Sequence, residues 1–201
     1  MTKTLSIIFS GWLVTFFLTL ISLQGCIQDD CGPFPIVEFD ALMSDVYHVK
    51  LDSQSSKYNL LQFNSSIDYS YNEVGVALAL QLKPLASLSF GLSSLIACSP
   101  PEYYAEVQSF IISSNEKYVE YNAGDDLTEI FDIQEINYGG ESINVSKYLS
   151  NNSNVMVGFE SYLLVMRVPP TTGGTHEFTI QIELIDGTIL ETTTEKVSIT
   201  Q

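Results

Sequence analysis

The sequence predicts a mainly β fold, an antiparallel β-sandwich with two short helices; an immunoglobulin-like arrangement is one form of it. Apolar residues alternate with polar or small ones through residues 73–82 and 176–184, which is the period of a strand with one buried face. Asp186-Gly187 follows the second run and precedes another extended segment, as in a two-residue hairpin. Strands do not alternate with long helices, so a parallel α/β fold is not expected.

The other strands follow from weaker forms of the same pattern. Residues 36–50 alternate imperfectly and predict a first strand, interrupted near residues 41–44. Proline pairs at 100–101 and 169–170 mark boundaries, because proline cannot continue a central strand. We expect strands at residues 36–50, 58–63, 73–82, 107–113, 159–168, 176–184 and 188–199, and a serine-rich loop at 85–97.

Two short helices are expected between the central strands. In residues 123–131, Asp126 can cap a helix and Glu129, three positions later, can reach back to the cap's amide. In residues 142–149, Ser142 is the expected cap of a helix with an apolar face.

Residues 1–25 predict a lipoprotein signal peptide. Lys3 precedes an apolar run that ends in Leu23-Gln24-Gly25-Cys26, which resembles a lipobox. Cys26 then becomes the lipidated first residue, residues 26–35 form a tether, and residues 36–201 form a single β-sandwich domain. An uncleaved signal anchor and a plain secretory signal peptide are the alternatives, since the run approaches the roughly 20 residues that span a bilayer.

Acidic residues follow the cysteine closely. Asp29 and Asp30 resemble the surface-export tag of lipoproteins in the Bacteroides–Flavobacteria group, and a solvated acidic linker is the alternative. The expected location is therefore the outer membrane or cell surface, through a lipid anchor.

Charge excludes one class of partner. The chain has 8 basic and 24 acidic residues, a formal net charge of −16. Lys3 is the only charge in residues 1–25, so its removal leaves 7 basic against 24 acidic residues, or −17. Such a chain repels phosphate backbones, so nucleic acid is not an expected partner. Hydrophobic residues make up 45% of the chain, enough to bury a core.

Two cysteines remain if Cys26 carries lipid. Cys31 and Cys98 are a candidate disulfide in an oxidising compartment, and the bridge would stabilise the fold by about 4 kcal/mol in the chain-entropy model. Two buried free thiols are the alternative. We expect no metal or other cofactor, because no Cys-x-x-Cys is present and only His48 and His176 could assist.

No catalytic residues are predicted. The serine-rich segment at 91–95 lacks the second glycine of a nucleophile elbow, and neither histidine lies in a recognisable triad pattern. The densest acidic cluster is explained by helix capping, although paired carboxylates of a glycosidase are set by spatial and not sequential spacing. Its members are Asp125, Asp126, Glu129 and Asp132.

Tyrosines near predicted loops and strand ends are the remaining candidates for ligand contact. They form the pairs Tyr69 and Tyr71, Tyr103 and Tyr104, and Tyr118 and Tyr121. Of these, Tyr103 and Tyr104 are the candidate contacts to a glycan or protein partner. Ordinary packing in the core or at strand edges is the alternative, and it is the interpretation we prefer.

Several local motifs together resemble a known family. In chain order they are Cys31-Gly32-Pro33-Phe34-Pro35, Tyr71-Asn72-Glu73-Val74-Gly75-Val76, Ala97-Cys98-Ser99-Pro100, Gly124-Asp125-Asp126-Leu127 and Asp186-Gly187. This order resembles an uncharacterised lipoprotein family, a domain of unknown function, of the Bacteroides–Flavobacteria group. The resemblance implies a lipid-anchored, β-rich envelope protein and no established activity.

The function that we expect is that of a non-enzymatic binding or assembly module in the cell envelope. Its expected partners are the membrane, through the N-terminal lipid, and a glycan or another protein. An accessory subunit of an envelope complex is the alternative, and a carboxylate-dependent carbohydrate hydrolase is a third hypothesis.

The intact mass of membrane-extracted protein, alkylated without prior reduction, tests the anchor and the disulfide together. We expect a species that begins at Cys26, carries acyl mass and has no alkyl group on Cys31 or Cys98. Alkylation of both thiols would remove the disulfide and keep the anchor. Retention of residues 1–25 would contradict the lipoprotein prediction.

Overall fold

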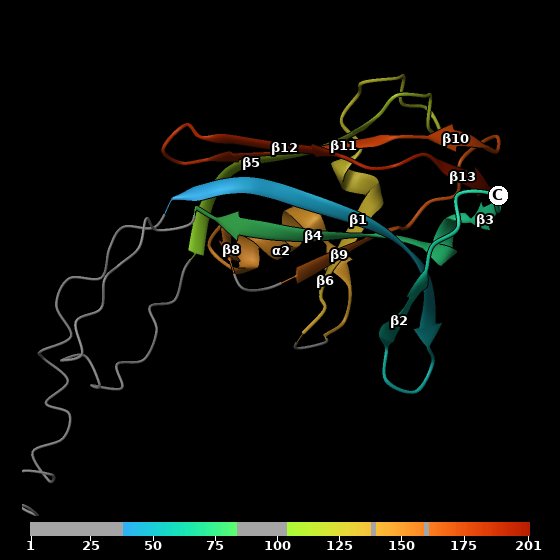
Figure 1. Ribbon diagram of the computed structural model, residues 1–201, viewed down its shortest axis with the longest axis horizontal. Coiled ribbons are helices and arrows are strands. Elements are labelled where there is room, and N and C mark those ends of the chain that lie inside the picture. Colours follow the sequence, from blue (N-terminus) through green and yellow to red (C-terminus); the bar gives the residue numbers. More distant parts are fainter. Residues whose placement is uncertain (1–37, 84–103, 138–139, 159–160) are drawn as a thin grey trace, which may run out of the picture. The chain divides into compact units, whose positions relative to one another are not determined.

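The computed structural model describes residues 38–83, 104–137, 140–158 and 161–201 (Figure 1). These residues belong to one compact unit, formed by residues 37–84 and 102–201. The predicted signal peptide and tether, and with them Cys26, Cys31, Cys98 and Tyr103, lie outside the described residues. The loop predicted at 85–97 lies outside them as well.

The larger sheet has six antiparallel strands. In spatial order they are β2 (Lys57–Gln62), β1 (Phe39–Asp52), β4 (Val74–Leu82), β9 (Ser161–Met166), β6 (Phe131–Glu135) and β7 (Ile143–Asn144). The longest of them, β1, pairs with β2 on one side and with β4 on the other. It runs without interruption through residues 41–44, and its only register shift lies between Phe39 and Ala41, so the expected break is wrong.

Two smaller sheets complete the fold. The four-stranded sheet has the order β12 (Ile189–Thr193), β11 (Phe178–Leu184), β5 (Tyr104–Ser114) and β8 (Val155–Val157). The three-stranded sheet has the order β10 (Gly174–His176), β13 (Val197–Thr200) and β3 (Tyr69–Ser70), and its β13–β3 pair is parallel. The helical elements are η2 (Tyr71–Glu73), η3 (Thr128–Ile130) and α2 (Val145–Asn151). The predicted mainly β, sandwich-like fold is thereby confirmed.

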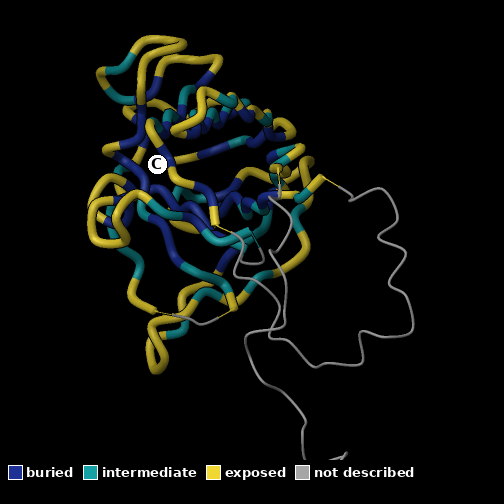
Figure 2. The backbone as a smooth tube through the Cα atoms, turned by 90° about the vertical axis from the view of Figure 1, so that its left-hand side faces the viewer, coloured by how far each residue is buried: buried dark blue, intermediate teal, exposed yellow. Residues whose placement is uncertain are grey.

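The core lies between the six-stranded and four-stranded sheets. Alternate side chains of β4 and β11 are buried in one cluster, among them Leu78, Phe178 and Ile180. The ring of Phe131, from β6, meets that of Phe178 edge-on at a centroid distance of 5.5 Å. Figure 2 shows the buried backbone concentrated in the interior, with exposed positions mainly at the turns. The alternation that predicted these strands therefore follows from burial of one face.

The outer face of the six-stranded sheet carries a second, smaller core. Val49, Leu163 and Val165 are buried there, although they point away from the main cluster. The turn of the β1–β2 hairpin reaches over this face, because the side-chain amide of Gln134 on β6 donates to the carbonyl of Ser56 at 3.2 Å. Three strands separate β2 from β6, so the hairpin must curl across the sheet.

The C-terminal strand prediction is wrong in one respect. Residues 188–199 form two strands, β12 and β13, in different sheets. Between them Thr194 is buried, its amide donates to the carbonyl of Phe178, and its hydroxyl accepts from the amide of Phe178. These bonds fix the point where the chain leaves the four-stranded sheet.

The helix predictions are only partly right. The first helix shrinks to the single turn η3, and strand β6 begins directly after it. The cap residue of the turn is Leu127 and not Asp126, although the carboxylate of Asp126 accepts from the amide of Thr128 at 2.9 Å. Glu129 instead accepts from the hydroxyl of Ser146 at 3.0 Å, so the expected capping box is absent from this turn. The cap of α2 is Asn144 and not Ser142, since residues 143–144 pair with β6 as strand β7.

A substitution at Gly75 tests the packing of the smaller core beneath the β1–β2 hairpin. A Cβ at this position would lie 2.6 Å from Val49 Cγ1 and 2.7 Å from Leu163 Cδ1. Gly75→Ala is therefore expected to lower the free energy of unfolding by about 1–3 kcal/mol, measured by urea denaturation. Gly140→Ala is the matched control, because nothing lies within 4 Å of its added Cβ. Equal stability of the two variants would contradict this packing.

Candidate functional site

A pocket of about 590 Å³ lies at one end of the sandwich. It is lined by the loop between β2 and β3, by His48 of β1 and Tyr69 of β3, and by Glu195 in the connection between β12 and β13. Besides these three residues, the lining consists of Gln62, Phe63, Asn64, Ser65 and Ile67. The pocket thus combines elements that are far apart in the sequence.

Hydrogen bonds within the β2–β3 loop give it a defined shape. The side chain of Asn64 accepts from the amide of Ser66 at 3.0 Å, and the carbonyl of Asn64 accepts from the amide of Ile67 at 3.1 Å. The hydroxyl of Tyr69 accepts from the amide of Asn64 at 3.1 Å. An Asx-type turn of this kind needs asparagine or aspartate at its first position, which explains Asn64. The loop is therefore braced on the buried Tyr69.

Three of the lining residues, His48, Phe63 and Tyr69, have rings that contact one another. The centroid of Tyr69 lies 5.0 Å from that of His48 and 5.2 Å from that of Phe63, with tilted planes. Tyr69 is held in turn by the β3–β13 pairing, and its carbonyl accepts from the hydroxyl of Thr200 at 3.2 Å. Aromatic pairs at this separation stabilise one another beyond simple burial.

The polar side chains of the pocket have spare hydrogen-bonding capacity. Within the described part of the chain, the side chains of His48, Gln62, Ser65 and Glu195 make no hydrogen bond or ion pair. Glu195 is the carboxylate of the lining, and no lysine or arginine contributes to it. Such a site can accept and donate hydrogen bonds to a small polar ligand.

Apolar side chains border these polar groups. Ile67 is 47% exposed in the pocket wall, and Leu61 is 44% exposed on β2, directly opposite His48 in the β1–β2 register. Phe63 is half-buried against the core. A ligand that covers these groups would remove apolar surface from water.

Tyr104, a candidate contact from the sequence, lies at the opposite end of the sandwich. It is exposed at the start of β5, where it pairs with Val157. A Cβ on the adjoining Gly158 would lie 2.8 Å from the ring of Phe39, so this end adjoins the start of β1. His48 is nine residues further along β1, about 30 Å away at strand rise. The structure therefore does not bring Tyr104 into the pocket.

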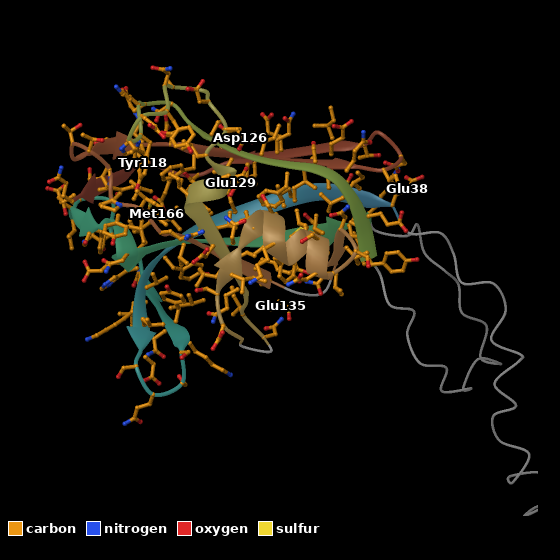
Figure 3. All side chains as sticks on the ribbon, turned by 180° about the vertical axis from the view of Figure 1, so that it is seen from behind. Glu38, Tyr118, Asp126, Glu129, Glu135 and Met166 are labelled. Carbon is orange, nitrogen blue, oxygen red and sulfur yellow. The ribbon has the colours of Figure 1, made fainter. Side chains whose placement is uncertain are left out.

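The other tyrosine pairs serve packing. Tyr118 is fully buried, and its hydroxyl donates to the carbonyl of Val168 at 2.8 Å and contacts the sulfur of Met166 at 3.3 Å (Figure 3). Burial raises the pKa of the Tyr118 phenol. Tyr71 and Tyr121 are partly buried against the same core. Of the described members of the pairs named from the sequence, only Tyr69 lines the pocket.

The acidic cluster stabilises local structure. Each of Asp125, Asp126, Glu129 and Asp132 has a partner; in order these are Asn122, Thr128, Ser146 and Arg167. Burial raises the pKa of Asp132, and the guanidinium of Arg167 at 3.5 Å opposes this effect. Among the described residues, no group of three or more histidines, cysteines, aspartates and glutamates is placed to hold a metal ion.

His176, the second histidine, belongs to the core. Its Nδ1 lies 3.0 Å from the hydroxyl of Ser114, and its ring stacks on Phe178 at 5.8 Å. Nε2 is buried and has no partner among the described residues. With exposed fractions of 1% for His176 and 3% for Ser114, this pair is closed to a substrate, so it cannot act as a nucleophile and base.

Sequence reasoning missed the pocket for a definite reason. Glu195 lay inside a segment predicted to be one continuous strand, and residues 64–66 were not assigned a role. The signal that was present is Asn64-Ser65-Ser66, whose asparagine can form a side-chain turn. Placing this turn beside residue 195 requires the sheet topology.

No protein-family model, no curated protein sequence and no solved structure matches this chain. In the part of the chain that the structure describes, no helix is both long and apolar enough to span a bilayer. Interpretation of the pocket therefore depends on its own geometry and chemistry.

Buried His176 predicts a pH dependence of stability. Burial lowers its pKa below the ordinary 6.5, against a weaker opposing effect of Glu116, so the unfolded state binds the proton more readily. The stability that comes from keeping His176 neutral is fully present above pH 6.5. It is lost as the pH falls from 6.5 to the lower pKa of His176 in the folded state. We expect the free energy of unfolding, from urea denaturation, to fall between about pH 7.5 and about pH 5.5.

The control for this measurement is His176→Gln, which removes the titrating ring and keeps a polar side chain beside Ser114. The variant is expected to show a flatter profile over the same pH window. A profile as steep as that of the wild type would assign the effect to another group.

Proposed function

We propose that this protein is a lipid-anchored, non-enzymatic binding module of the cell envelope, and that the pocket between the β2–β3 loop and Glu195 is its ligand site. The observation that carries the proposal is the pocket itself. Its loop is braced by hydrogen bonds within the protein, while the side chains of His48, Gln62 and Ser65 make none to the described residues. A preformed shape with unused polar groups is typical of a binding site.

The described chain begins at a distance from the pocket, which supports a pocket that remains accessible when the N-terminus is anchored. The described chain begins at Glu38, beside the start of β1, whereas His48, which lines the pocket, lies in the second half of the same strand. A lipid on Cys26 would be joined to Glu38 by twelve residues, which span at most about 40 Å when extended. A tether that ends at Glu38 would join the domain at the end of β1 that lies away from His48.

The chemistry of the pocket supports binding over hydrolysis. A glycosidase of the usual type needs two carboxyl groups on either side of the bond to be cleaved. The lining contributes a single carboxylate, that of Glu195, and its one histidine, His48, makes no hydrogen bond to a serine or a carboxylate of the described residues. We therefore place the hydrolase hypothesis last.

A second candidate function, that of an accessory subunit, is favoured by the opposite end of the molecule. Tyr104, Ile185 and Ile189 are exposed there, by 56%, 68% and 58%. The amide of Ile185 donates to the carbonyl of Glu106, two residues from Tyr104, which places these side chains on neighbouring strands. Exposed apolar groups in this setting can contact another envelope protein.

The function can be tested with full-length protein extracted in mild detergent and immobilised. The probes are fractionated glycans and peptides from the envelope of the producing cells. We expect saturable binding that Ser65→Trp abolishes, because the indole would fill the pocket. Gln54→Trp, in the exposed turn of the β1–β2 hairpin, is the matched control and should bind as the wild type does.

The same experiment separates the alternatives. Bound material recovered with unchanged mass agrees with a non-enzymatic module, and a change of mass would point to an enzyme. A fixed protein partner that survives Ser65→Trp but is lost in Ile185→Ser would favour the accessory subunit. Absence of any pocket-dependent binding would refute the proposal.

A further inference from the structure

We infer that the ligand of the pocket is a neutral saccharide unit, such as one residue of an uncharged glycan. The inference rests on the proposed function and specifies the chemistry of the ligand. It follows from the charge, the hydrogen-bonding groups and the apolar surface of the lining.

Charge excludes anionic ligands. The lining holds the carboxylate of Glu195 and no lysine or arginine, and the whole chain has a formal net charge of −16. A phosphate, sulfate or uronate would therefore approach a negative protein and find no cation in the pocket to pair with. Given a mixture of acidic and neutral glycans, this pocket is therefore expected to bind the neutral ones.

The polar groups match hydroxyls, which donate and accept at the same atom. The Gln62 amide offers both a donor and an acceptor, and Ser65 offers a hydroxyl. The Oδ1 of Asn64 is occupied by the amide of Ser66, which leaves the Nδ2 of Asn64 without a described acceptor. His48 and Glu195 add a ring nitrogen pair and a carboxylate acceptor. Several neutral polar groups around one space suit a ligand with several hydroxyls.

The apolar groups match the C–H face of a sugar ring. Phe63 is half-buried and Ile67 is exposed, and both line the pocket beside the polar groups. Small-molecule sites in general are lined predominantly by hydrophobic side chains with few polar groups. Here the polar side chains are the majority, so a mainly apolar ligand would leave them unpaired at a cost. The volume of about 590 Å³ is within the ordinary range for small-molecule sites, about 300–1,000 Å³.

The test is calorimetric titration of the full-length protein in detergent with three sets of probes. They are neutral oligosaccharides cut from glucan, mannan, xylan and galactan, acidic oligosaccharides cut from polyuronates, and peptides of mixed sequence. We expect saturable binding of a neutral oligosaccharide and none of the acidic set. Gln62→Ala and Glu195→Ala should each raise Kd by about three- to tenfold, the effect of one lost hydrogen bond.

Matched controls keep the result interpretable. Gln81→Ala and Glu191→Ala remove exposed side chains of the same types from β4 and β12, outside the pocket, and should leave Kd unchanged. All four positions are exposed, so the variants are expected to fold. Thermal unfolding of each variant confirms that any loss is local.

The outcomes distinguish this inference from the proposed function. Peptide binding that is weakened by Gln62→Ala and Glu195→Ala, without saccharide binding, would overturn the ligand class and keep the pocket as a binding site. Tighter binding of the acidic oligosaccharides would also overturn it. Silence of all three probe sets would overturn the inference and the proposed function together.

Discussion

Burial of alternating side chains between the two larger sheets is the interaction on which the rest of the structure depends. Each fully buried side chain such as Leu78 or Ile180 contributes about 1.5–3 kcal/mol relative to an exposed one. This burial fixes the register of β4 and β11, because a shift by one residue would turn their apolar faces to solvent. Once these strands are fixed, so are the points at which β1 and β13 leave the sandwich. The pocket lies at those points.

The pocket thus forms where β1 extends beyond its partner strand and where the chain passes from one sheet to another. The chain passes from β12 to β13 at the buried Thr194, and the next residue, Glu195, lines the same pocket as the β2–β3 loop. Meanwhile, β1 extends past its pairing with β4 at Val74, so His48 and the hairpin lie at the rim of the sandwich. The smaller core beneath the hairpin, around Val49, gives this extension a rigid base. The geometry of the pocket therefore requires no element beyond those that build the fold.

The local sequence pattern predicted most of the strands. The features that it did not predict depend on pairing between distant segments. The segments at 73–82 and 176–184 carry strict alternation, and the structure has strands there. Residues 188–199 carry the same extended preference, yet the bonds of Thr194 to Phe178 divide them between two sheets. No local preference encodes this division. For the same reason Glu195 could not be assigned to a site from the sequence, while the packing role preferred for Tyr118 was correct.

The hydrogen bond from Thr200 to the carbonyl of Tyr69 joins residues that are 131 positions apart. Contacts of such high sequence separation form late, because a long loop must close before they stabilise anything. The position of Tyr69 in the pocket therefore depends on the pairing of β3 with the last strand, β13. A chain crossing a membrane from its N-terminus would carry the β2–β3 loop outside well before that strand. The pocket would then form only in the final step of export and folding. A chain that is not yet fully exported would have the β2–β3 loop outside the membrane but no complete pocket.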